Sequence, residues 1–101
     1  MVLFVCFDLP REDEIARKQA TAFRKRLINL GFHMKQYSLY ERSVRRTETR
    51  IKLIEMIKEN VPDSGEITIY ELPDEVHEKQ LIVLGKQAVM KTNRNPRMRV
   101  F

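Results

Sequence analysis

Asp8 is the residue of this sequence that is best placed to do chemistry. It follows an apolar run of six residues, Val2 to Phe7, and stands two positions before Pro10. A carboxylate at the end of a buried strand can project where a loop opens to solvent, and its oxygens bind hard cations such as magnesium or manganese. One carboxylate alone makes a weak site, so a metal would need two copies of the chain, each contributing Asp8. The other interpretation, which the local sequence alone favours, is that Asp8 caps the following helix by accepting hydrogen bonds from its free backbone N–H groups.

Other classes of catalytic or metal site find little support in the residue types. The chain holds one cysteine, Cys6, and two histidines, His33 and His77, without the paired spacing of a zinc site. No nucleophile-elbow glycines surround the serines, and three glycines in all leave no phosphate-cradling loop. Cys6 lies inside the apolar run and is interpreted as a small core residue. Asp8 therefore remains the candidate for catalysis.

Positive charge is concentrated in two segments of the chain. Residues 11–52 carry a net charge of +7 and residues 86–101 carry +5 without an acid, whereas residues 53–85 carry −6. Charge divided in this way favours a polyanion, such as nucleic acid, as the partner of one part of the surface. The alternative is an ordinary solvated face with i,i+4 ion pairs such as Glu14–Lys18. The candidate phosphate-binding residues are Arg11, Arg17, Lys18, Arg24, Lys25, Arg42, Arg45 and Arg46.

The elements that must position these residues follow from apolar spacing and turn residues. In chain order they are a buried strand at 2–7, a helix at 12–30, one or two strands within 32–43, a second helix at 47–60, a strand at 66–72, one helical turn within 74–80 and a short strand at 80–85. The predicted core stripes of the helices are Ile15, Ala16, Ala20, Phe23, Leu27 and Leu30 on the first, and Ile51, Ile54, Ile57 and Val61 on the second.

This order of elements predicts an α+β fold, a ferredoxin-like βαββαβ sandwich with an additional C-terminal strand. Two helices cannot cover both faces of its sheet. Because residues 2–7 are apolar at every position, we expect the second face to be covered too, and a second copy of the chain is the simplest cover. We therefore expect a homodimer of a ferredoxin-like domain over residues 1–85, with a basic tail over residues 86–101 that contributes to partner or DNA binding.

The composition predicts a folded cytoplasmic protein. The chain has 101 residues, about one domain, of which 43% are hydrophobic and 33% are charged. The apolar runs are too short to span a bilayer, and the first residues lack the pattern of a signal peptide, so we expect no membrane partner.

Several motifs together resemble one known family. The stretches "FVCFDLP", "FRKRLINLGFHMKQYSLYERS", "GEITIYEL" and "QLIVLG" follow one another at this spacing in the small CRISPR-associated adaptation proteins of the Cas2 family, over about residues 2–85. The likeness is greatest to members from systems with a single-protein effector. The resemblance implies a ferredoxin-like subunit in a symmetric homodimer, in which the final strand of each subunit extends the sheet of the other. It also implies a role in spacer acquisition, in which the dimer bridges two dimers of the Cas1 integrase beneath a foreign DNA duplex.

The resemblance leaves two functions for Asp8 and the basic residues. The first is a DNA-binding scaffold for spacer acquisition, in which the matching aspartate is dispensable. The alternative is a magnesium- or manganese-dependent endonuclease, acting on RNA or on double-stranded DNA through paired Asp8 carboxylates, as assigned to some members. A third interpretation, a single-stranded RNA binder of the RRM type, expects exposed aromatic residues such as Phe4, Phe7 and Tyr40, but its glycine-bearing signature is absent.

Overall fold

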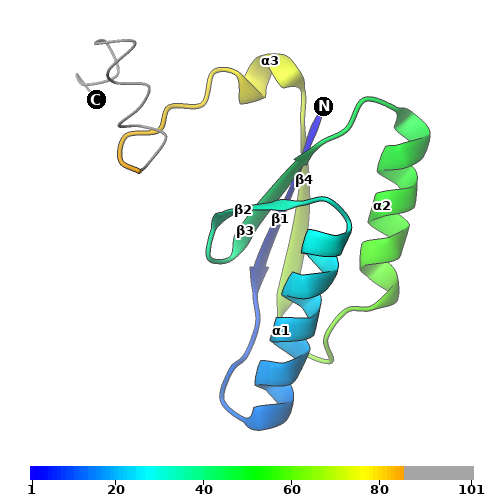
Figure 1. Cartoon of the computed structure of the whole chain (residues 1–101), viewed down its shortest axis with the longest axis vertical. Coiled ribbons are helices and arrows are strands. Elements are labelled where there is room, and N and C mark those ends of the chain that lie inside the picture. The colour runs from blue at the N-terminus through cyan, green and yellow to red at the C-terminus, as the bar shows by residue number, and fades with distance from the viewer. Residues whose placement is uncertain (86–101) are drawn as a thin grey trace.

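The computed structural model describes residues 1–85, which form a single sheet with two long helices on one of its faces (Figure 1). The elements are β1 (Val2–Asp8), α1 (Glu14–Asn29), β2 (His33–Gln36), β3 (Leu39–Ser43), α2 (Thr47–Glu59), β4 (Glu66–Leu72) and α3 (Asp74–His77). The sheet has the strand order β2-β3-β1-β4, and every neighbouring pair is antiparallel. The predicted α+β, ferredoxin-like fold is therefore confirmed. Within residues 1–85, no helix is both long and apolar enough to cross a membrane.

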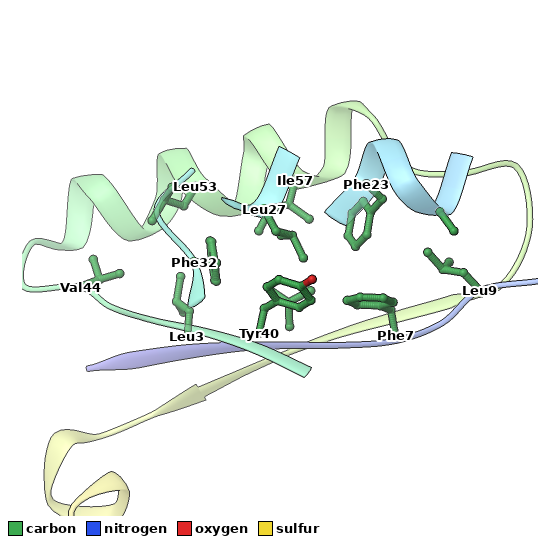
Figure 2. Close-up of a cluster of buried hydrophobic side chains, with 12 residues drawn as sticks. Leu3, Phe7, Leu9, Phe23, Leu27, Phe32, Tyr40, Val44, Leu53 and Ile57 are labelled. Carbon is green, nitrogen blue, oxygen red and sulfur yellow. The ribbon is translucent and has the colours of Figure 1, made fainter. Parts of the chain in front are cut away.

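The core lies between the sheet and the two long helices, where Figure 2 shows the buried side chains filling the space between the layers. Successive residues of a strand point to opposite faces, so alternate residues of the central strand β1, namely Leu3, Val5 and Phe7, meet the helices. The buried cluster consists of Leu3, Val5, Phe7, Leu9, Ala20, Phe23, Leu27, Phe32, Tyr40, Val44, Leu53 and Ile57.

Helix α1 begins later than its apolar pattern indicates. Asp13 is its N-cap, and the Asp13 carboxylate accepts a hydrogen bond of 2.7 Å from the backbone N–H of Ala16. The prediction that Asp8 caps this helix is therefore wrong, because Asp8 is the last residue of β1. Past the other end, Gly31 adopts a φ of +88°, a conformation that favours glycine and turns the chain into β2.

The buried stripes of the helices are narrower than predicted. On α1, Ile15 is 70% exposed, although Ala20, Phe23 and Leu27 are buried as expected. On α2, the buried residues are Leu53 and Ile57, one helical turn apart, while Ile51 and Val61 are exposed. The predicted stripe is wrong at these last two positions because the helix turns its Leu53 side to the sheet and ends before Val61.

The two strands β2 and β3 form a hairpin with a two-residue turn, Tyr37 and Ser38, and their register shifts between Met34 and Gln36. Of the one or two strands predicted within 32–43, the structure therefore has two, with an irregularity in β2. The residue Val44, directly after β3, donates its backbone N–H to the Met1 carbonyl at 2.8 Å, so the hairpin is also joined to the start of β1.

The face of the sheet that lies away from the helices is partly covered by the chain itself. Val2 and Phe4 point to this open face and are nevertheless buried. The segment after β4 folds over that side, below the sheet in Figure 2, and the ring of His77 in α3 lies 5.8 Å from the ring of Phe4. A second copy is therefore not needed to bury these two residues. Cys6 on the same face is exposed, so its interpretation as a core residue is wrong.

The apolar run at residues 80–85 forms no strand within the described part of the single chain. Three of its side chains are exposed, namely Leu81, Val83 and Leu84, and Leu84 is 91% exposed. The predicted tail over residues 86–101 lies outside the described residues.

Candidate nucleic-acid interface

Asp8 stands where the sequence predicts, exposed at the C-terminal end of β1. Its partner across the sheet is Glu66, the first residue of β4. The preceding Gly65 allows this close pairing: its φ is +105°, and a Cβ there would lie 2.7 Å from the Asp8 carbonyl oxygen. Among the described residues, no group of three or more histidine, cysteine or acidic side chains gathers to hold a metal ion.

The loop after β1 brings two of the predicted arginines together. Arg17, in the first turn of α1, donates from Nη1 to the backbone carbonyl of Arg11 at 3.2 Å. Arg11 in turn donates to the hydroxyl of Tyr37, and its guanidinium carbon lies 5.2 Å from the centre of the Tyr37 ring. Contacts of this kind are cation–π interactions, in which a cation is attracted to the electron-rich face of a ring.

Arg24 reaches the same tyrosine from the middle of α1. Its guanidinium carbon lies 4.5 Å from the ring centre of Tyr37 and 5.4 Å from that of Phe7. The Arg24 Nε atom is buried and has no hydrogen-bond partner among the described residues. Arg11, Arg17, Arg24 and Tyr37 are called the Tyr37 cluster below.

The Tyr37 cluster is cationic without a neutralising acid. Of the ion pairs formed within residues 1–85, none includes an arginine of the cluster. The two lysines predicted with it, Lys18 and Lys25, lie further along the exposed side of α1, where they line a shallow groove with Arg17. Lys18 pairs with Glu14 at 3.5 Å, as the i,i+4 spacing predicts. Four of the eight predicted basic residues therefore lie on one flank of α1, namely Arg17, Lys18, Arg24 and Lys25, and a fifth, Arg11, lies in the loop before the helix.

The other three predicted residues lie apart from this flank. Arg42 donates from Nη1 to the carbonyl of Leu30 at 3.0 Å and so completes the C-terminal end of α1. Arg45 and Arg46 lie between β3 and α2, and Arg46 pairs with Glu48 at 3.0 Å. Figure 1 shows this connection at the end of the sheet opposite to the loop after β1.

The aromatic residues decide against the RRM interpretation and reveal one residue that the sequence did not mark. Phe4, Phe7 and Tyr40 are all buried, so they offer no exposed stacking platform. Tyr37, in contrast, is 55% exposed and contacts two arginines. Nothing in its spacing identified it, because its partners come from two other elements of the chain.

Comparisons with known proteins agree on one family. The family model described as CRISPR associated protein Cas2 matches residues 1–80. Two relatives carry the name CRISPR-associated endoribonuclease Cas2. The one from Paracidovorax avenae is 31% identical over 86 residues, covering 85% of this chain and 80% of its own length. The one from Treponema denticola is 30% identical over 101 residues, covering all of both chains. The crystal structure of Streptococcus pyogenes Cas2 at pH 6.5 has the same fold, with a TM-score of 0.64 and 21% identity over 84% of this chain and all of that one.

Proposed function

Because this chain belongs to the Cas2 family of CRISPR-associated proteins, we propose that it is a DNA-binding homodimeric scaffold for spacer acquisition. In this role it bridges Cas1 integrase dimers and supports a foreign DNA duplex. The observation that carries DNA binding is the flank of α1. Its Arg17 and Arg24, together with Arg11 from the preceding loop, have no carboxylate partner within residues 1–85 and continue into Lys18 and Lys25. Such a row of cations suits the phosphates of a duplex and reads no bases.

The homodimer follows from what the single chain leaves uncovered. Tyr70 on the open face and the apolar side chains of Leu81, Val83 and Leu84 are exposed within residues 1–85. Strand β4 is an edge of the sheet, so one side of its backbone is available for pairing with another strand. A second copy, contributing its residues 80–85 along β4, would cover both features. The bridging of Cas1 rests on family membership.

Duplex binding is tested by measuring affinity for a short DNA duplex at several salt concentrations. We expect the logarithm of the binding constant to fall linearly with the logarithm of salt concentration, with little dependence on base sequence. Arg17→Ala should reduce the steepness of this line by roughly one. The control is Lys52→Ala on α2, away from the flank, which should leave the slope unchanged. A flat salt response of the unchanged protein would rule out the phosphate-contact model.

A second candidate function is a magnesium- or manganese-dependent endonuclease that uses Asp8. It is favoured by the exposure of Asp8 at the end of β1 and by the endoribonuclease name of the relatives. In this candidate function, two copies of the chain each contribute Asp8 to the cation site, because one carboxylate alone makes a weak site. The test is Asp8→Asn in purified protein, with RNA and DNA substrates and each cation. Loss of cation-dependent cleavage with retained duplex binding would support the nuclease, whereas cleavage that survives the change would reject Asp8 as its centre.

A further inference from the structure

We propose that Tyr37 is a positioning residue of the duplex-binding surface. Its ring holds the guanidiniums of both Arg11 and Arg24, so that both meet the phosphate backbone of one duplex. This inference rests on the proposed function. It adds an uncharged residue, Tyr37, to the residues that take part in DNA binding.

The geometry depends on three elements that meet only in the folded chain. Tyr37 comes from the β2–β3 turn, Arg11 from the loop after β1, and Arg24 from α1. The turn is fixed to the end of β1 by a hydrogen bond of 3.0 Å from the Phe7 backbone N–H to the Ser38 carbonyl. This hydrogen bond restricts the motion of the turn, so that Tyr37 stays beside the arginines.

Tyr37 holds each arginine in a different way. Arg11 donates to the Tyr37 hydroxyl and also lies over the ring, at 5.2 Å from its centre. Arg24 lies over the ring at 4.5 Å, and the buried Phe7 supports it at 5.4 Å. An aromatic face restricts where a guanidinium lies but leaves most of its N–H donors free for another acceptor.

The contacts of two other arginines show why this arrangement points to a ligand. Arg26 donates from Nε and Nη2 to the carbonyl of Met56, and Arg42 donates to the carbonyl of Leu30. In those two guanidiniums, N–H donors are already bonded to backbone carbonyls of the protein itself. The two on Tyr37 have no carboxylate within ion-pair distance in residues 1–85. Phosphates of a bound duplex would supply the anionic acceptors that both guanidiniums lack in this part of the chain, and little side-chain entropy would be lost on binding because both are already held.

The test compares Tyr37→Leu with Tyr37→Phe in the full chain, using the affinity for a short DNA duplex at several salt concentrations. Tyr37→Leu should weaken binding by roughly fivefold to twentyfold, because the DNA must then order two released arginine side chains. Its salt slope should stay unchanged, because no charge is lost. Tyr37→Phe keeps the ring and should lose at most about threefold, the share of one hydrogen bond. Arg24→Ala, in contrast, should lower the slope by roughly one.

A third comparison separates positioning from direct contact. In the Arg11→Ala/Arg24→Ala background, adding Tyr37→Leu should have no further effect, since nothing is left to position. If it weakens binding there as much as in the unchanged protein, Tyr37 touches the DNA itself and the inference is wrong. It is equally wrong if Tyr37→Leu binds normally while the unchanged protein shows the steep salt response. If the unchanged protein shows no salt-dependent duplex binding, the proposed function falls first and this inference falls with it. An unchanged melting temperature of each variant confirms that it folds.

Discussion

The two faces of β1 carry nearly the same kind of residue and are covered in different ways. Leu3 and Val5 on the helix face meet α1 and α2 in a continuous apolar core. Val2 and Phe4 on the open face are buried as well, but outside that core. The cover on their side includes α3, a helix of four residues. An apolar strand sequence thus indicates that both faces of the strand are buried. It does not indicate which segment or partner buries each face.

The cover of the open face is held largely by polar contacts. The ring of His77 pairs with Glu41 at 3.2 Å, and Lys35 donates to the side chain of Gln80 at 2.7 Å. The amino group of Met1 pairs with Asp74 at 2.6 Å. Such contacts each contribute little at a partly exposed site, so this cover should open before the helix layer does.

The largest effect is expected on the helix face. Leu27→Ala should lower the free energy of unfolding by about 3–5 kcal/mol, because Leu27 is fully buried and its removal leaves a cavity. The neighbouring Ile28, which is 56% exposed, supplies the matched control, and Ile28→Ala should change stability by less than about 1 kcal/mol. Urea denaturation measures both. Similar losses at the two positions would mean that α1 packs on a different side.

A smaller effect is expected from Phe4→Ala on the open face, at about 1–3 kcal/mol. Phe4 is buried, but α3 can come away from the sheet at little cost, so less of a cavity remains. Urea denaturation at two protein concentrations separates this loss from any effect on a dimer. A loss of stability as large as that of Leu27→Ala would contradict the proposed difference between the two faces, since both would then be equally well packed.

His77→Ala should change the global free energy of unfolding by less than about 1 kcal/mol, because its contact with Glu41 is partly exposed. Its local effect should be clear. The backbone N–H groups of His77 and Glu78, which bond to Pro73 and Asp74, should exchange with solvent faster when α3 loses its contact with the sheet. Glu75→Ala on the exposed side of α3 is the control. Unchanged exchange in His77→Ala would show that α3 is held by other contacts.

The sequence predicted the elements well because their signals are local. Apolar spacing and turn residues lie within a few residues of what they specify, and the strand predicted over 2–7 runs one residue further, to Asp8. The cap of α1 was assigned to Asp8 instead of Asp13, since both are aspartates near the start of the helix and only the path of the intervening loop decides between them.

The candidate site was less predictable because its parts are joined through the fold. Charge identified Arg24 and Arg42 equally, yet one lies over aromatic rings and the other binds the end of a helix twelve positions away in the chain. Tyr37 has no charge, and its position in the sequence matches no motif. Its role becomes visible only in the folded chain, where three separate segments bring it together with Arg11 and Arg24. Which arginines are free for a ligand is a property of tertiary packing.

The smallest effect on stability is expected at Cys6, in the part of the open face that α3 leaves uncovered. Cys6→Ser should leave the free energy of unfolding unchanged within about 0.5 kcal/mol, because the side chain is exposed between Leu39 and Thr68. Its thiol nevertheless reports on the proposed dimer. In dilute protein, a thiol reagent should modify Cys6 readily, and the rate should fall as concentration rises and a second copy covers this face. If the rate stays equally fast over a concentration range in which sedimentation shows monomer passing to dimer, the second copy lies elsewhere and the open face of β1 is left to solvent.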